Sequence, residues 1–163
     1  MALVGALLLA LFSVAAAAQD ADVPFIVTPD RVTREMLKLA NVKPGDYVID
    51  LGSGDGRIVI AAAKHFGARG LGVEILLELV ELSRVNAKKA GVADRAEFRV
   101  EDLFATDLSR ATVITLYLLP EVNLRLKPAL MLLLAAPEGV IAHGNEIIVN
   151  GKRIVVKLAE AKP

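Results

Sequence analysis

An apolar run that leads into alternating glycines places the strongest constraint on how this chain can fold. Residues 47–51 read Tyr-Val-Ile-Asp-Leu, and Gly52, Gly54 and Gly56 follow before a helical pattern begins. A continuous apolar and β-branched run is typical of a buried parallel strand. Glycines after such a strand permit a sharp turn into a helix and the close approach of a ligand to the backbone. The segment therefore predicts a strand, a ligand-binding turn and a helix.

Helical patterns and short apolar runs alternate along the rest of the chain. Helices are expected over residues 58–66 and 76–87, each followed by a glycine, and apolar runs occur at 71–73 and 96–100. Such alternation is typical of β-α-β units with right-handed crossovers. We therefore expect an α/β, Rossmann-like fold with a mainly parallel sheet flanked by helices.

The C-terminal part predicts a fifth strand over residues 139–142 and then a hairpin. Apolar runs at 147–149 and 153–156 are joined by Asn150-Gly151, which is typical of a type I′ turn. We expect this C-terminal antiparallel hairpin to form two edge strands of the sheet.

Acids end the first three expected strands, at Asp50, Glu74 and Asp102. The carboxyl ends of parallel strands meet at one edge of a sheet, where ligands of open α/β folds bind. Glu74 follows Gly56 by 18 residues, close to the roughly 20-residue offset of an acid that meets ribose hydroxyls. Asp102 is placed to accept from an adenine amino group. Acids beside the loop repel a pyrophosphate and attract ammonium and sulfonium charges, which predicts S-adenosylmethionine as the ligand.

Two other interpretations of the glycine-rich turn compete with this one. A nicotinamide dehydrogenase is disfavoured, because the glycines depart from G-x-G-x-x-G and Asp50 lies beside them. The glycines taken alone would also suit an ordinary tight turn between a strand and a helix.

The order of these motifs resembles a known family. Residues 50–56 (Asp-Leu-Gly-Ser-Gly-Asp-Gly), 72–74 (Gly-Val-Glu) and 101–103 (Glu-Asp-Leu) are similar to motifs of class I S-adenosylmethionine-dependent methyltransferases. Residues 24–29 (Pro-Phe-Ile-Val-Thr-Pro) and 115–120 (Thr-Leu-Tyr-Leu-Leu-Pro) resemble more narrowly the bacterial relatives of the mitochondrial protein-lysine methyltransferases. That family includes the enzyme that methylates the c-ring protein of ATP synthase.

The resemblance implies a methyltransferase domain over residues 24–160, S-adenosylmethionine as cofactor, no metal, and a protein lysine as acceptor. A small amine or another metabolite is the alternative acceptor, and an inactive cofactor-binding module is the alternative outside catalysis. We expect the cofactor to be bound by the loop, the strand ends and the preceding segment, at Thr28, Asp50, Gly52, Ser53, Gly54, Asp55, Gly56, Glu74, Asp102 and Leu103.

The segment before the first strand predicts an amphipathic helix. Thr28 is expected as its N-cap and Pro29 as its first residue, with an apolar face made by Val32, Met36, Leu39 and Ala40. The resemblance implies that Phe25 and Thr28 form a lid over the cofactor. A helix that only packs on the sheet is the alternative.

Catalytic candidates lie where the fourth and fifth strands end. Tyr117 is placed to flank the incoming amine while a carbonyl near Leu118 accepts an N–H, and His143 is placed to take a proton. A partly exposed residue at the edge of the core is the alternative for Tyr117, and a strand-end residue without a role in catalysis is the alternative for His143. Methyl transfer depends mainly on orientation, so a dedicated base is optional.

Composition narrows the partners. A chain of 163 residues corresponds to one domain by the usual size of about 100–200 residues. Its 19 basic and 19 acidic residues cancel, so no basic surface for nucleic acid is predicted. The absence of cysteine excludes disulfides and thiolate metal sites.

Residues 1–18 are expected to be a signal peptide or a membrane anchor. Residues 2–18 are uncharged and apolar and end in four alanines, which suits a cleavage site although no basic residue precedes the stretch. Their length lies at the lower limit of the roughly 17–25 residues that span a bilayer. Export to the periplasm, anchoring in the membrane and a misassigned start are the alternatives.

The C-terminal region departs from the family that the chain resembles. Only Gly144-Asn145 separates the fifth strand from the hairpin, where relatives have a longer acidic and aromatic segment, so substrate capture is in question. Residues 129–136 are apolar on every side, which predicts either a deeply buried helix or one covered by a partner or a membrane.

Overall fold

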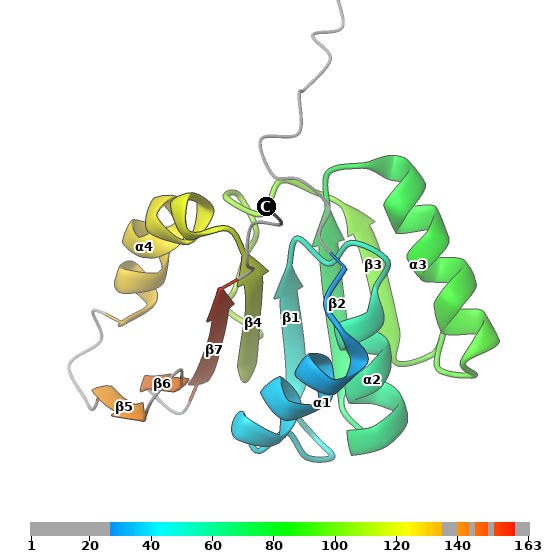
Figure 1. Ribbon diagram of the computed structural model, residues 1–163, viewed down its shortest axis with the longest axis horizontal. Coiled ribbons are helices and arrows are strands. Elements are labelled where there is room, and N and C mark those ends of the chain that lie inside the picture. Colours follow the sequence, from blue (N-terminus) through cyan, green and yellow to red (C-terminus); the bar gives the residue numbers. More distant parts are fainter. Residues whose placement is uncertain (1–26, 135–139, 144–145, 150–151, 159–163) are drawn as a thin grey trace, which may run out of the picture.

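The computed structural model describes residues 27–134, 140–143, 146–149 and 152–158. Helices and strands alternate through most of the chain (Figure 1), in the order α1 (Asp30–Leu39), β1 (Tyr47–Leu51), α2 (Arg57–Phe66), β2 (Arg69–Glu74), α3 (Leu77–Lys89), β3 (Ala96–Val100), β4 (Val113–Leu118), α4 (Pro120–Leu134), β5 (Val140–His143), β6 (Glu146–Val149) and β7 (Lys152–Leu158). The predicted leader at residues 1–18 and Phe25 lie outside the described residues.

The sheet has the strand order β3-β2-β1-β4-β7-β6-β5. Strands β1 to β4 pair in parallel, which confirms the predicted Rossmann-like, mainly parallel fold. Strand β7 pairs in parallel with β4 and in antiparallel with β6. The expectation that both hairpin strands lie at the edge is therefore wrong for β7, and β5 forms that edge. The predicted turn at residues 150–151 lies outside the described residues.

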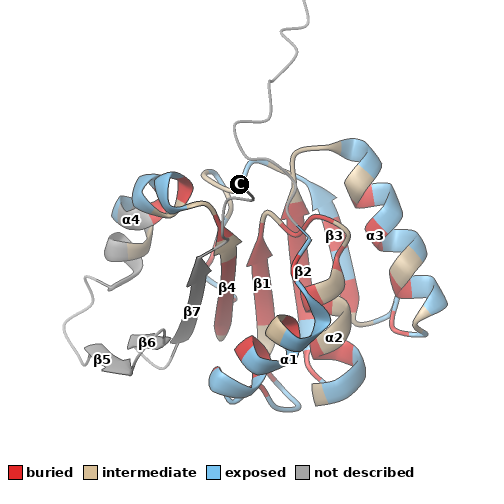
Figure 2. Cartoon of the chain, viewed as in Figure 1, coloured by how far each residue is buried: buried red, intermediate tan, exposed pale blue. Residues whose placement is uncertain are grey.

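Helices cover both faces of the parallel strands, which are largely buried (Figure 2). On one face, α1 and α2 pack on β1 and β4 through a cluster that contains Met36, Leu37, Val48, Ile58 and Val113. Next to it, α2 and α3 enclose the ring of Phe98. On the opposite face, Val122 and Leu126 of α4 pack against Ile49, Leu71 and Leu116. The carboxyl ends of β1, β2 and β4 are thus fixed by burial on both sides.

Helix α1 differs from its prediction at two points. Pro29 has an extended ψ of 141° and is the N-cap, so the helix begins one residue later than expected, and no side chain caps it. Leu37 is fully buried, whereas Leu39 is 56% exposed. The helix therefore turns a slightly different stripe toward the sheet, because α1 packs on both α2 and the sheet.

The apolar segment at residues 129–136 overlaps the end of α4, which contains Pro128. Leu130 is partly buried and packs against the core on that side of the sheet. Within the described part of the chain, no helix combines the length and the apolar character needed to cross a membrane.

Candidate functional site

The glycine-rich loop joins β1 to α2 at the carboxyl edge of the sheet. Gly52, Gly54 and Gly56 have φ values of 74°, 53° and 81°, in the left-handed region that glycine adopts without strain. The amides of Gly52 and Ser53 both donate to the carbonyl of Val73, at 3.0 and 2.9 Å. The loop is therefore fixed against the end of β2, as its sequence predicts.

Two glycines are required by space. A Cβ on Gly56 would lie 2.7 Å from the ring of Phe98 and 2.9 Å from the Cβ of Ser83. A Cβ on Gly72 in β2 would lie 2.7 Å from Phe98 and from both side-chain atoms of Ser53. The loop and α2 can approach the sheet only because these positions lack side chains.

Asp50 is the most deeply buried acid of the site, at 1% exposure. It pairs in register with Thr115 of β4, whose hydroxyl donates to Oδ1 of Asp50 at 2.6 Å. Its Oδ2 atom is buried and has no hydrogen-bond partner among the described residues. Burial raises the pKa of Asp50 to about 7, the hydrogen bond from Thr115 opposes that rise, and the charges of Glu74 and Asp55 add to it.

Ser53 has the same unusual state. Its side chain is 6% exposed, and its Oγ atom is buried without a partner in the described part of the chain. Buried polar atoms are normally paired in folded proteins. Asp50 Oδ2 and Ser53 Oγ are thus two buried polar atoms beside the loop that are available to a ligand.

Glu74 ends β2 and organises the loop through its carboxylate. Oε2 accepts from the amide of Gly54 at 3.0 Å, and Oε1 accepts from the amides of Ile75 and Leu76 at 2.8 and 3.3 Å. The side chain is partly exposed, and each carboxylate oxygen accepts more than one hydrogen bond. The prediction that Glu74 meets ribose hydroxyls is therefore compatible with its place beside the loop.

Helix α3 holds the carbonyls of the loop, a feature absent from the sequence prediction. The hydroxyl of Ser83 donates to Gly54 O at 2.9 Å, and Nδ2 of Asn86 donates to Asp55 O at 3.1 Å. The one signal in the sequence is a serine on the buried face of a helix, since a fully buried hydroxyl needs an acceptor.

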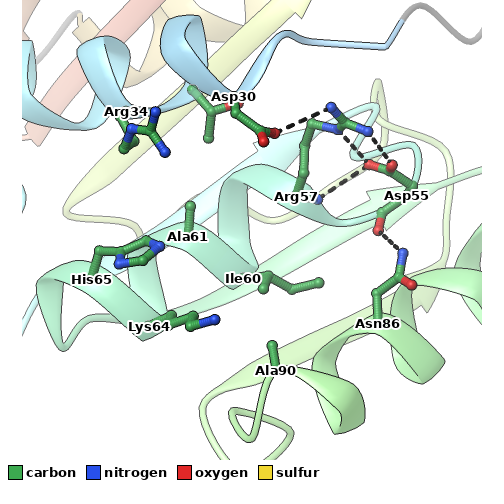
Figure 3. A pocket seen from close by; sticks show the side chains of 11 residues that line it. Asp30, Arg34, Asp55, Arg57, Ile60, Ala61, Lys64, His65, Asn86 and Ala90 are labelled. Carbon is green, nitrogen blue, oxygen red and sulfur yellow. Dashed lines mark hydrogen bonds and ion pairs between the residues drawn. The ribbon is translucent and has the colours of Figure 1, made fainter.

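Asp55 and Thr28 meet through Arg57, which the sequence prediction also missed. The Asp55 carboxylate accepts from Nε of Arg57 at 2.9 Å and from Nη2 (Figure 3). Nη1 of Arg57 donates to the backbone carbonyl of Thr28 at 2.6 Å. Thr28 itself is 5% exposed. Both residues lie near the loop, but the Asp55 carboxylate is occupied by an arginine.

Asp102 and Leu103 follow β3 and flank the loop in different ways. Asp102 is exposed, and its Oδ1 accepts from the amide of Phe104 at 2.9 Å. Leu103 packs against the core, and its Cδ2 would lie 3.7 Å from a Cβ on Gly52. The chain therefore brings Leu103 to the loop, while Asp102 stabilises the turn that carries it.

The end of β4 forms the other wall. Leu118 is buried, and its Cδ2 would lie 2.8 Å from a Cβ on Gly52. The carbonyl of Leu118 accepts from Nδ2 of Asn123 at 3.1 Å, and Oδ1 of Asn123 is buried without a partner in the region described. Asn123 was not predicted, because its place became clear only with the turn of α4 over the strand end.

The two catalytic candidates are not brought together by the described contacts. Tyr117 is partly buried and packs against the cluster between α1, α2 and the sheet. His143 ends β5 at the far edge of the sheet, and its side chain lies outside the described atoms. Their roles in catalysis stay predictions.

Comparison with known proteins agrees with this geometry. Residues 50–147 match the ANTKMT methyltransferase domain. The protein-lysine N-methyltransferase of Saccharolobus islandicus is 42% identical over 139 residues, which cover 85% of this chain and 86% of that protein. The lysine N-methyltransferase of Homo sapiens that is named for the ATP synthase c-subunit is 35% identical over 133 residues, which cover 78% of this chain and 56% of that protein.

A solved structure gives the same picture of the fold. It is described as an RNA methyltransferase from Salinibacter ruber in complex with S-adenosyl-L-homocysteine and is 44% identical to this chain. The two superpose with a TM-score of 0.66 over 85% of this chain and 97% of that chain.

Proposed function

The chain belongs to the ANTKMT methyltransferase family and is an S-adenosylmethionine-dependent methyltransferase, and we propose that its acceptor is the ε-amine of a protein lysine. Two relatives named as lysine N-methyltransferases, at 42% and 35% identity, support a lysine acceptor. The balance of 19 basic and 19 acidic residues argues against a nucleic-acid acceptor.

The observation that carries the proposal is the pair of unpartnered buried oxygens at the glycine-rich loop, Asp50 Oδ2 and Ser53 Oγ. An anionic acceptor in a buried site fits a ligand with positive charge. S-adenosylmethionine supplies a methyl group already activated on a sulfonium. We assign Asp50 to attract the cationic part of the cofactor, Ser53 to hydrogen-bond it, and Glu74 to accept from its ribose hydroxyls.

The loop itself orients the cofactor. Its backbone is held by Val73 on one side and by Ser83 and Asn86 on the other. Fixing both reactants in a near-attack geometry removes roughly 7–11 kcal/mol from the barrier of a bimolecular reaction. We therefore assign most of the catalysis to this rigid support, and Asp102 and Leu103 to the adenine end.

The wall at the end of β4 suits a neutral amine. Leu118 is buried, Leu119 is partly buried, and both belong to the apolar cluster of that face. Entry of a lysine beside these side chains lowers the pKa of its ammonium, because burial disfavours the charged form. The free carbonyl capacity of Leu118 and the Oδ1 atom of Asn123 would then accept N–H groups of the amine, with Tyr117 at its flank.

Acceptor class is tested with the full chain and methyl-labelled S-adenosylmethionine. We expect label in a protein extract from the source organism, and its loss when lysines are first blocked by reductive dimethylation. Label in total RNA, or only in small metabolites, would replace the lysine proposal with that class. Binding without any turnover would identify an inactive module. Calorimetric titration should show heat with S-adenosylmethionine and none with NAD.

The N-terminal segment is a separate proposal. We propose that residues 2–18, which carry no charge, direct the protein to the membrane, either as a cleaved export signal or as an anchor. Mass spectrometry of the N-terminus after cell fractionation separates the two: a mature protein that begins near Gln19 indicates cleavage, and an intact chain in the membrane fraction indicates an anchor. An intact chain without membrane association would contradict both.

A further inference from the structure

We propose that Arg57 is a positioning residue that latches the segment entering α1 to the glycine-rich loop, so that closure over the cofactor and the shape of the loop form one unit. The inference rests on the proposed placement of the cofactor at this loop. It assigns no contact between Arg57 and the reacting atoms.

The guanidinium of Arg57 joins three backbone segments. Nε and Nη2 bind both oxygens of Asp55 in the loop, and Nη1 donates to Thr28 O at 2.6 Å. Nη1 also lies 3.6 Å from Oδ1 of Asp30 in the first turn of α1. Thr28 and Asp30 are more than 20 residues from Arg57 along the chain, so this one side chain provides a tertiary link between α1 and the loop.

The position of Arg57 is costly for a purely local role. It is the first residue of α2, and no acid lies in the first turn of that helix. A cation there opposes the positive end of the helix dipole. Asp55 and Asp30 offset that cost, and the hydrogen bond with Asp55 raises the pKa of Arg57. The side chain is 26% exposed, so these contacts are partly shielded from water.

Loop and latch are held independently, which separates their effects. Ser83 and Asn86 bind the loop carbonyls from α3, and Val73 binds its amides from β2. The loop therefore keeps its own support when Arg57 is removed. The residues just before α1, however, lose the hydrogen bond that ties Thr28 to the loop.

This geometry also gives Asp55 a defined role. Both of its oxygens are engaged by Arg57, and Figure 3 shows the pair at one end of a hollow of about 250 Å³ between α1, α2 and α3. Asp55 therefore acts through Arg57 by holding the fork that reaches Thr28.

The test replaces Arg57 by Met, which keeps the stem and removes the guanidinium. S-adenosylhomocysteine affinity is measured by calorimetry, and hydrogen exchange of residues 27–39 is measured with and without that ligand. We expect wild-type protein to gain protection in this segment on binding. Arg57→Met should lose that gain and bind about tenfold more weakly, the loss typical of a charged hydrogen bond.

Arg95→Met is the matched control. Arg95 also donates to a backbone carbonyl of another element, Ala63 O at 3.2 Å, and also lies beside an acid, Asp94. Its side chain is 34% exposed, much like that of Arg57. It lies at the start of β3, away from the loop, so we expect unchanged affinity and unchanged protection of residues 27–39.

Arg57→Lys keeps the protein testable if Arg57→Met does not fold. A lysine retains the charge, but one ammonium cannot reproduce the fork to Asp55 together with the bond to Thr28. We again expect weaker binding and lost protection. Wild-type affinity and wild-type protection in the folded variant would overturn the latch. Failure of the wild-type protein to bind S-adenosylhomocysteine would instead overturn the proposed cofactor site.

Discussion

The two walls of the candidate site are built from different materials. At the glycine-rich loop, Val73, Glu74, Ser83 and Asn86 all place hydrogen bonds on the backbone. At the end of β4, leucine side chains dominate, and the described polar contact is that between Asn123 and the carbonyl of Leu118. The loop side is specified for one ligand, whereas the β4 side supplies an apolar surface with few directional contacts.

This contrast teaches where specificity resides in such a domain. Fixed polar groups cost no reorganisation when a charged ligand arrives, so they suit a cofactor that is the same in every cycle. An apolar wall tolerates several acceptors and keeps an amine neutral. Substitutions on the loop side should therefore change cofactor binding, and those on the β4 side should change turnover alone.

The largest effect is expected for Gly56→Ala. The new Cβ would meet the Phe98 ring at 2.7 Å, and φ is 81°. Overpacking and left-handed strain together should lower the free energy of unfolding by about 3 kcal/mol and abolish cofactor binding. Gly91→Ala, with φ 71° but no atom within 4 Å, should cost only about 1 kcal/mol. Equal losses in chemical denaturation would show that the loop is not tightly packed.

Asp50→Asn should have opposite effects on binding and on stability. S-adenosylmethionine binding should weaken by about 1.5–3 kcal/mol, as when a hydrogen bond to a charged group is lost. The folded-state pKa of Asp50 is raised from 3.8 to about 7, so its ionisation destabilises wild-type protein as pH rises across that interval. The variant should therefore be more stable than wild type at pH 8. Calorimetry and denaturation measure the two effects, and a variant less stable at pH 8 would contradict the burial argument.

The same carboxyl group predicts a pH dependence. A cationic ligand prefers ionised Asp50, so wild-type affinity for S-adenosylmethionine should fall severalfold between pH 7.5 and pH 6, around the pKa of about 7. Asp50→Asn should show a flat profile over this range. Parallel slopes in the two proteins would assign the dependence to another group.

Asn123→Ala tests the β4 wall. Loss of the bond to Leu118 O, a neutral hydrogen bond worth about 1 kcal/mol, should lower kcat by roughly fivefold. Affinity for S-adenosylmethionine should stay unchanged, as measured by calorimetry. A matching loss of cofactor affinity would mean that the two walls are not separate.

Tyr117→Phe should give the smallest change. Its ring is packed against the cluster between α1, α2 and the sheet, and the substitution keeps that packing. We expect less than a threefold change in kcat, because aromatic contact with the amine is retained. A large drop, with cofactor affinity preserved, would assign the hydroxyl a direct role.

Local patterns predicted the loop side well. The glycines and the acids at Asp50 and Glu74 are read from one strand-turn-helix unit and from strand ends. Arg57, Ser83 and Asn86 could not be assigned, because their partners are set by how helices dock rather than by spacing. The position of β7 beside β4 was missed for the same reason, since a hairpin pattern fixes which strands pair but not where the pair joins the sheet.

The bare backbone at Gly72 limits how this domain can diversify. Any side chain there would strike both Phe98 and Ser53, so enlargement requires that the core ring and the loop serine shrink in the same step. Single substitutions at this site are dead ends. Descendants of this chain are therefore free to explore new acceptors long before they can exchange the molecule that donates the methyl group.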